Sequence, residues 1–241
     1  MLIDRRTLLL GGLATAAAAC TSNKKDAADT AADEAAKPIQ VSPGETVSLG
    51  QIEAKPTVPK EKVPKSVVMV GDSITALSKT TLETVLTNMG FESVIVNAEK
   101  SRRIEVGGSK PMPGLDVVKY IAASSPPEMW IIALGTNDAG LYATDEDYQG
   151  LVDDMLAAIP KELPLVWISV YRHDKLEGCS HFNIIVRQAL QKRGHATIGE
   201  WNQQCMDSEE SILTDDGVHP NSNGILVFAD TVRAAVASEL N

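Results

Sequence analysis

Apolar runs and helical repeats alternate along the chain from residue 66 to the C-terminus. Five apolar runs have the length of buried parallel strands, at 66–70, 91–96, 130–134, 165–170 and 196–201. Segments with apolar residues every three or four positions predict five helices, at 74–89, 115–123, 145–159, 182–192 and 221–240. Five strand–helix units predict a doubly wound α/β fold, in which helices cover both faces of a parallel sheet.

The first 20 residues have the pattern of an export signal. Arg5 and Arg6 precede an apolar stretch of 12 residues, Leu8–Ala19. This stretch is shorter than the roughly 20 residues that cross a bilayer, and its length is typical of the apolar core of a signal peptide. Arg5-Arg6-Thr7-Leu8-Leu9 resembles a twin-arginine signal. We therefore expect residues 1–20 to direct export.

Cys20 is the candidate lipidation site. Ala17-Ala18-Ala19-Cys20 resembles a bacterial lipobox, in which Cys20 would be lipidated and become the mature N-terminus. The same residues also fit an ordinary secretory cleavage site or a structural cysteine. The lipobox interpretation is favoured, and it predicts a protein anchored in the cell membrane that faces the periplasm or the cell wall. The alternative is a secreted protein.

Residues 21–65 have the composition of a tether. Thr21–Lys37 is rich in Ala, Asp, Thr and Lys without long aliphatic residues, and five prolines lie between Lys37 and Lys65. The first part lacks the apolar surface to fold alone, and the second favours an extended chain. A low-complexity, Pro-rich tether is therefore expected at 21–65, before a globular domain at 66–241. The alternative is that Val41–Ile52 forms a short strand against the domain.

The net charge of the chain limits the classes of molecule that it is expected to bind. The chain has 22 Lys and Arg against 32 Asp and Glu, a net charge of −10, and the whole acidic excess lies in 66–241. Proteins that bind a phosphate backbone need clustered Lys and Arg, so no nucleic-acid partner is expected. The sequence has no phosphate-binding loop and no dinucleotide-binding motif, and its four histidines lack the spacing of metal ligands. Neither a cofactor nor a metal is therefore expected.

Two of the three cysteines are candidates for a disulfide. If Cys20 is lipidated, Cys179 and Cys205 remain as an even pair in an oxidising compartment. A bridge between them is expected, and the alternative is two buried thiols.

Three short motifs lie where a parallel α/β sheet places its chemistry, beyond the carboxyl ends of the strands. They are Gly71-Asp72-Ser73 after the first strand, Gly135-Thr136-Asn137-Asp138 after the third, and Asp216-Gly217-Val218-His219 before the last helix. Read alone, the first two are good turn or helix-capping sequences, and a single histidine is usually a surface residue. The first motif offers a candidate nucleophile, and the third offers a histidine that an aspartate three residues earlier can orient as a general base.

The order and spacing of the three motifs resemble the SGNH hydrolases, the GDSL-type serine esterases, over residues 66–241. The resemblance implies a flavodoxin-like three-layer α/β sandwich with a five-stranded parallel sheet, and acyl-ester chemistry. By position, Ser73 would be the nucleophile, His219 its general base and Asp216 the residue that orients His219. Asn137 and the N–H of Ser73 would bind the oxyanion.

One block departs from the family pattern. Ser101 stands where the family has the glycine whose N–H is the third oxyanion donor. The donor survives if the backbone angle at Ser101 is ordinary, and Gly107 or Gly108 are alternatives. The form Asn-Ala-x-x-Ser-Arg at 97–102 is similar to SGNH domains of bacterial cell-envelope esterases and acyltransferases. Arg102 and Arg103 are candidates for contact with an anionic substrate or for a solvated loop.

The sequence therefore predicts an exported, tethered serine esterase that acts through an acyl-enzyme on O-acyl groups, chiefly O-acetyl groups, of envelope carbohydrate. An O-acyltransferase uses the same chemistry. A lipid esterase or thioesterase is one alternative, and a glycan-binding domain without turnover is another. The expected partners are a small ester substrate and the membrane, and the catalytic domain is expected to be monomeric. For Trp201 and Tyr171, burial in the core is favoured over stacking on a sugar.

Overall fold

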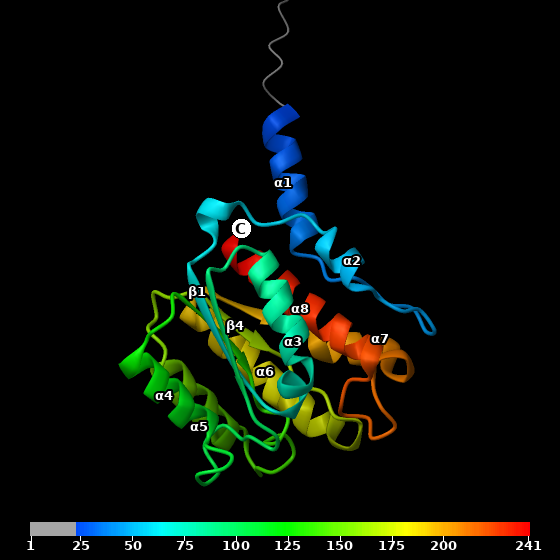
Figure 1. The fold of residues 1–241 in the computed structure, drawn as a ribbon. Coiled ribbons are helices and arrows are strands. Elements are labelled where there is room, and N and C mark those ends of the chain that lie inside the picture. Colours follow the sequence, from blue (N-terminus) through cyan, green and yellow to red (C-terminus); the bar gives the residue numbers. More distant parts are fainter. Residues whose placement is uncertain (1–22) are drawn as a thin grey trace, which may run out of the picture.

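The computed structural model describes residues 23–241, and a five-stranded parallel sheet forms its centre (Figure 1). The strands are β1 (Ser66–Gly71), β2 (Ser93–Ala98), β3 (Met129–Ala133), β4 (Leu165–Ile168) and β5 (Ala196–Gly199). Their order across the sheet is β2-β1-β3-β4-β5. From β1 the chain continues to β2 at one edge of the sheet, and from β3 it continues through β4 to β5 at the other edge. Parallel sheets bind ligands at the carboxyl ends of the two strands between which the order reverses, here β1 and β3.

Helices cover both faces of the sheet. The longer ones are α1 (Asn23–Ala35), α3 (Ser73–Asn88), α4 (Gly114–Ser124), α5 (Asp145–Ala157), α6 (Leu176–Arg193), α7 (Trp201–Ile212) and α8 (Ser222–Leu240). Two short elements, α2 (Leu49–Glu53) and the 3-10 turn η1 (Lys60–Lys62), precede β1, and the 3-10 turn η2 (His173–Lys175) precedes α6. The layer of α3, α7 and α8 covers one face, and the layer of α4, α5 and α6 covers the other (Figure 1).

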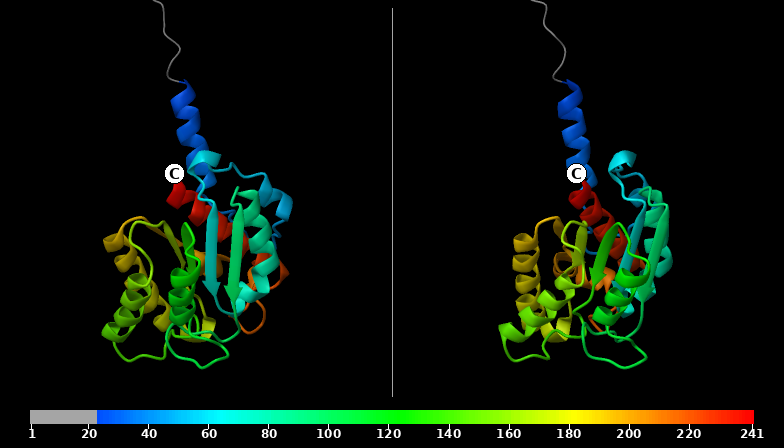
Figure 2. Two further views of the ribbon diagram at one scale, coloured as in Figure 1. Left: turned by 60° about the vertical axis from the view of Figure 1, so that its left-hand side comes forward. Right: turned by 90° about the vertical axis from the view of Figure 1, so that its left-hand side faces the viewer.

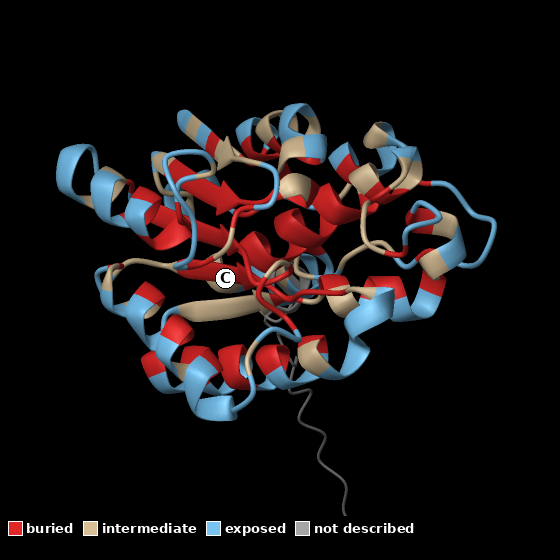
Figure 3. Cartoon of the chain, turned by 90° about the horizontal axis from the view of Figure 1, so that it is seen from below, coloured by how far each residue is buried: buried red, intermediate tan, exposed pale blue. Residues whose placement is uncertain are grey.

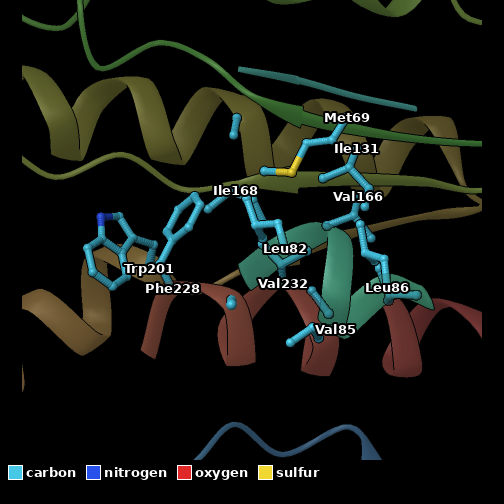
Figure 4. Close-up of a cluster of buried hydrophobic side chains, with 14 of the residues drawn as sticks. Met69, Leu82, Val85, Leu86, Ile131, Val166, Ile168, Trp201, Phe228 and Val232 are labelled. Carbon is cyan, nitrogen blue, oxygen red and sulfur yellow. The ribbon is translucent and has the colours of Figure 1, made fainter. Parts of the chain in front are cut away.

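Side chains that alternate along each strand supply two separate cores. Met69, Ile131 and Val166 point toward the α3, α7 and α8 layer, where they meet Leu82 and Val232 (Figure 4). The intervening residues of the same strands, including Val70, Ile132 and Trp167, face α4, α5 and α6. Both faces of the three central strands are therefore buried, as their continuous apolar runs require, whereas the edge strand β2 is partly exposed.

The flavodoxin-like three-layer sandwich expected from the sequence is confirmed. Within residues 66–241 the differences lie at element boundaries and in one missed helix, α7. β2 begins two residues later than expected, and α6 begins six residues earlier. α7 was missed because most of its residues are polar, its apolar positions do not follow a regular helical repeat, and its helical geometry breaks at Ser208. Trp201, expected at the end of a strand, is instead the first residue of α7, and it is buried together with Tyr171.

The tether prediction for 21–65 is wrong for the part that follows α1. Residues 35–58, which we call the N-terminal strap, lie against α3, α7 and α8 (Figure 1). Five apolar side chains of the strap are buried in the same core as α3 and α8: Ala35, Val41, Val47, Ile52 and Val58. They are spaced too irregularly to signal a strand or helix in the sequence. Val41–Ile52 accordingly packs on the domain, but without forming a strand.

The molecule has two distinct ends. The carboxyl ends of the strands lie at one end, and α1 and the C-terminus lie at the opposite end (Figure 2). Figure 3 looks onto the first of these ends and shows the buried sheet between helices whose outer faces are exposed. The predicted signal peptide and Cys20 lie outside the described residues. None of the helices in 23–241 is long and apolar enough to span a membrane.

The expected disulfide is absent from this structure. Cys179 in α6 and Cys205 in α7 are both buried free thiols. Burial raises the pKa of both, to about 11 for Cys179. The alternative weighed for the pair, two buried thiols, is therefore the one that the structure adopts.

Candidate active site

Ser73 lies where β1 turns directly into α3. Asp72 is the N-cap of the helix, and its Oδ1 accepts a hydrogen bond of 3.0 Å from the N–H of Ile74. Ser73 is consequently the first helical residue, beside backbone N–H groups and the positive end of the helix dipole. The turn is tight, because a Cβ on Gly71 would lie 2.0 Å from the hydroxyl oxygen of Thr75. Only glycine fits there.

His219 and Asp216 approach Ser73 from the loop between α7 and α8. His219 Nε2 lies 3.0 Å from Ser73 Oγ, and its Nδ1 lies 2.6 Å from Asp216 Oδ2. The three side chains named in the sequence as nucleophile, base and orienting carboxylate are thus joined in one hydrogen-bonded chain. Residues 73 and 219 are 146 positions apart, so the fold alone brings them together.

The environment of Asp216 keeps it ionised. Partial burial opposes ionisation, but the carboxyl accepts hydrogen bonds from the His219 ring, from the N–H groups of His219 and Val218, and from the Thr214 hydroxyl. Together these bonds hold the pKa of Asp216 well below its usual range. An ionised Asp216 fixes the proton of His219 on Nδ1, which leaves Nε2 free to accept the Ser73 proton.

Residues 213–221, which we call the catalytic loop, form a short hairpin. Leu213 and Pro220 make an antiparallel bridge at its base, and the N–H of Thr214 donates to the carbonyl of His219 at 2.8 Å. Gly217 at its tip has a φ of 65°, in the left-handed region that favours glycine. A Cβ there would also lie 2.5 Å from the Cβ of His173, so glycine is required on two grounds.

A second polar cluster supports the tip of the catalytic loop. The N–H of His173 donates to the carbonyl of Gly217 at 3.0 Å. The His173 ring lies 2.8 Å from Glu209, which also accepts a 2.5 Å hydrogen bond from the Tyr171 hydroxyl. This bond from Tyr171, aided by His173, lowers the pKa of Glu209. The sequence analysis missed this cluster because its members come from η2, α7 and the segment after β4, with no shared motif.

Asn137 lies between the turn that carries Ser73 and the loop that carries Ser101. Its side-chain Nδ2 donates to the carbonyl of Arg102 at 3.1 Å and lies 3.5 Å from Asp72 Oδ2. Asn137 therefore touches the residue before Ser73 and the residue after Ser101. The three predicted oxyanion positions converge at one end of the sheet.

The backbone of Ser101 departs from the expectation of an ordinary angle. Its φ is 59°, which lies in the left-handed region. Ser101 thus adopts a conformation normally left to glycine, asparagine or aspartate, although a serine stands there. Within the described residues no acceptor binds its N–H, which leaves that donor available. Gly107 and Gly108 lie farther along an exposed loop, and the Gly108 N–H already donates to Pro111.

Arg102 fits neither of the two roles considered for it. Its side chain is 3% exposed, so it is not in a solvated loop. Its guanidinium donates to the carbonyls of Gly71, Asn97 and Met112 at 2.8–3.1 Å. It therefore ties the ends of β1 and β2 to the following loop, and its Nη2 lies 3.4 Å from the Glu99 carboxylate. Burial lowers its pKa.

Asp138 is a second structural anchor that the sequence analysis did not single out. It is fully buried, and it accepts hydrogen bonds of 3.1 Å from both the Arg103 guanidinium and the N–H of Ile104. Arg103 also donates to Tyr142 at 2.8 Å. Asp138 thus fixes the loop that carries Ser101 against the loop that carries Asn137. Burial raises its pKa, while these bonds act in the opposite direction.

Asp72 is a buried carboxyl next to the nucleophile. It is 1% exposed, and its desolvation raises its pKa to about 6, against the lowering effect of the Ile74 N–H. Within residues 23–241, no three His, Cys, Asp or Glu side chains gather in a way that could hold a metal ion.

The fold is shared with solved structures of ester- and acetyl-handling proteins. The C-terminal catalytic domain of peptidoglycan O-acetyltransferase A from Streptococcus pneumoniae has a TM-score of 0.59 at 22% identity, with 72% of this chain and 93% of that one covered. A family 3 carbohydrate esterase from Clostridium thermocellum gives 0.56 at 15% identity, covering 73% and 96%. A Desulfitobacterium hafniense chain described as a lipolytic protein of the G-D-S-L family gives 0.52 at 16% identity, covering 71% and 99%.

This likeness shows that the chain shares its fold with these proteins. No family model matches the sequence, and no curated protein does. The assignment of a reaction to this chain therefore depends on the residues of the site themselves.

Proposed function

We propose that the protein is an exported, membrane-tethered serine esterase that cleaves O-acyl groups, chiefly O-acetyl groups, from envelope carbohydrate. The observation that carries the proposal is the continuous hydrogen-bonded chain from Asp216 through His219 to Ser73, with steps of 2.6 and 3.0 Å. A serine becomes a nucleophile at neutral pH when an oriented histidine can take its proton.

In the proposed reaction, Ser73 Oγ attacks the ester carbonyl while its proton moves to His219 Nε2. The tetrahedral intermediate then collapses, the C–O bond to the sugar breaks, and the departing sugar oxygen takes the proton from His219. The acyl group remains on Ser73. A water molecule, deprotonated by His219, attacks the acyl-enzyme and releases the carboxylic acid, with the proton returning to Ser73. Asp216 stabilises the charged imidazole in both halves of the reaction.

The oxyanion is assigned to Asn137 Nδ2 and the N–H groups of Ser73 and Ser101, and Asn137 would exchange its 3.5 Å contact with Asp72 Oδ2 for the oxyanion. Ser73 contributes an N–H at a helix N-terminus, where the dipole favours negative charge. The N–H of Ser101 has no acceptor within the described residues, which supports its role as third donor, although its φ of 59° is not the ordinary angle on which that role was expected to depend. Each such donor contributes roughly 3–4 kcal/mol to transition-state binding.

The substrate class rests on two supports. The first is the fold-level likeness to a peptidoglycan O-acetyltransferase and to a carbohydrate esterase. The second is the direction in which an anchored molecule would face. α1 begins at Asn23, three residues after the predicted lipidation site, and it lies at the end opposite the catalytic edge (Figure 2). An anchor on Cys20 would therefore leave Ser73 facing away from the membrane, toward wall carbohydrate rather than membrane lipid.

The decisive assay compares the wild type with Ser73→Ala on p-nitrophenyl acetate. Because the serine alone forms the acyl-enzyme, the variant is expected to lose about 10⁴-fold or more in kcat/KM. Equal rates for the two proteins would exclude an enzyme of this type and leave a glycan-binding domain. Near-UV circular dichroism checks that the variant is folded.

Substrate preference is tested with the same protein. We expect p-nitrophenyl acetate to be hydrolysed faster than the octanoate ester, and O-acetylated peptidoglycan to release acetate. A preference for octanoate would instead indicate a lipid esterase or thioesterase. Transfer of the acetyl group to an added glycan oligomer, in place of release as acetate, would identify an O-acyltransferase that uses the same acyl-enzyme.

A further inference from the structure

The N-terminal strap is held to α8 by a buried pair of charges. Arg233 and Asp230 are 4% and 1% exposed and form a salt bridge of 2.6 Å. Arg233 also donates to the carbonyls of Ala35 and Lys37, and Asp230 accepts the N–H of Ile39 at 2.5 Å. Buried charges are costly unless every hydrogen-bonding group is satisfied, and here the strap supplies the missing partners.

The next contacts lie at the end of α7, just before the catalytic loop. Ser208 breaks the helical geometry with φ −147° and ψ 30°, and its hydroxyl donates to the carbonyl of Val41. One turn later, the Ser211 hydroxyl accepts the N–H of Gly44 at 2.8 Å. The strap therefore binds the kinked last turns of α7, two residues before the loop begins.

The strap also binds the first turn of α8, just after the catalytic loop. Asn223 accepts the N–H of Val47 at 2.7 Å through its side-chain oxygen. Its side-chain nitrogen donates to the carbonyls of Glu45 and Ser211 at 3.0 and 3.2 Å. One side chain thus joins the strap, the end of α7 and the start of α8. Both ends of the catalytic loop are fixed by the same stretch of strap.

The two catalytic side chains of the loop are partly exposed, although Leu213, Gly217 and Pro220 of the same loop are buried. The side chains of Asp216 and His219 are 50% and 36% exposed, and residues 214–216 are exposed throughout. The position of His219 therefore depends on the supports of this loop: the His173 N–H at Gly217, and the points at which α7 ends and α8 begins. A misplacement of about 1 Å in a catalytic group costs on the order of 10²-fold in rate.

We propose that residues 35–48 of the strap are a positioning element for His219 and Asp216, so that the segment leading to the predicted anchor is also required for full catalytic rate. This inference rests on the proposed function of the same site. The strap does not touch the substrate. It holds the two ends of the catalytic loop at the separation that places His219 Nε2 within reach of Ser73 Oγ.

The test detaches the strap without altering α7, α8 or the loop. In the full-length chain, Val41→Asp/Val47→Asp places two charges at strap positions that are each 7% exposed. The matched control, Ser42→Asp/Thr46→Asp, adds the same charge at exposed positions of the same strap. We expect kcat on p-nitrophenyl acetate to fall about 10- to 100-fold in the first variant with KM changed less than threefold, and no change in the control.

A strap that only stabilises the fold would give a different result. In that case the melting temperature of Val41→Asp/Val47→Asp would fall while kcat at 20 °C stayed at the wild-type value, and this outcome overturns the proposal. If the double aspartate variant does not fold, Val41→Ala/Val47→Ala gives the same comparison, with a smaller loss of kcat expected. A folded alanine variant with unchanged kcat likewise overturns the proposal.

Hydrogen exchange separates this inference from the proposed function. Amide exchange in residues 213–221 is expected to quicken in Val41→Asp/Val47→Asp and to stay unchanged in the control. If the wild type hydrolyses no ester but this difference is found, the proposed function fails and the positioning inference stands. If esters are hydrolysed and exchange in the loop is the same in all three proteins, the inference fails alone.

Discussion

The two helical layers that cover the sheet contribute different parts of the site. The layer of α3, α7 and α8 carries the proposed proton relay, because Ser73 begins α3 and the loop from α7 to α8 holds Asp216 and His219. The loops that lead into α4 and α5, in the opposite layer, carry Ser101 and Asn137. The site therefore lies along the seam between the layers, with the relay on one side and the proposed oxyanion donors on the other.

The layers also differ in what fixes them. Hydrogen bonds from distant segments hold the relay side, including those of the N-terminal strap and of the cluster around Glu209. Two buried residues, Arg102 and Asp138, hold the oxyanion side. Substitutions on the relay side are accordingly expected to lower the rate by displacing or removing the base. Substitutions on the other side are expected to lower it by weakening the stabilisation of the negative charge on the oxyanion.

Removing the base should give the largest effect. His219→Ala leaves Ser73 without a proton acceptor, and we expect kcat on p-nitrophenyl acetate to fall about 10⁴-fold or more. His181→Ala is the matched control, because His181 is an exposed histidine in α6 outside the hydrogen-bonded chain. A rate for His219→Ala within tenfold of the wild type would mean that another group accepts the proton.

On the opposite side of the seam, Asn137→Ala removes one proposed oxyanion donor and leaves the relay in place. We expect kcat to fall about 10²- to 10³-fold, while KM and the pH dependence of the residual rate stay as in the wild type. Asn88→Ala serves as control, because Asn88 is exposed and its amide binds only Glu53. A large rise in KM at constant kcat would instead assign Asn137 to ground-state binding.

Residue patterns predicted much of this arrangement, and the reasons for the misses are physical. The three central strands, β1, β3 and β4, were recognisable because strands covered on both faces must be apolar throughout. The seam residues Ser73, Asn137 and His219 were recognisable because each follows a strand or precedes a helix in a short motif. The strap was misread because its buried side chains, such as Val41 and Val47, lie singly among polar residues and prolines. Their burial depends on α7 and α8, which lie more than 150 residues away in the chain.

Long-range polar partners were equally invisible. Arg102 reads as one of two loop arginines, and only the fold brings it against the carbonyl of Gly71. The same holds for Glu209, whose partners Tyr171 and His173 come from another part of the chain. Sequence periodicity reports which face of an element is buried, but it carries no information about which carbonyl a buried guanidinium will meet.

The two cores give a smaller, stability-based comparison. Leu82 in α3 and Leu151 in α5 are 0% and 3% exposed, one in each core. Leu82→Ala and Leu151→Ala should each lower the free energy of unfolding by about 3 kcal/mol, measured by urea denaturation. Because the strap shares a core with Leu82, amide exchange in residues 41–58 should quicken only in Leu82→Ala. Equal exchange in both variants would mean that the strap is not coupled to that core.

Asp72 lies at the seam itself, and it should give the smallest effect, visible only against pH. Burial raises its pKa from 3.8 to about 6, so the folded state holds this proton more tightly than the unfolded state. The stability that the proton provides is complete below about pH 4 and is lost as the pH rises through 6. The loss is at most about 3 kcal/mol for a shift of this size.

Asp72→Asn keeps an acceptor for the Ile74 N–H without the charge. Its free energy of unfolding relative to the wild type should therefore rise between pH 4 and pH 7, whereas the exposed control Asp116→Asn should show no such trend. A difference between Asp72→Asn and wild type that stays constant over this range would mean that Asp72 is ionised throughout, held so by Asn137 and the helix N-terminus.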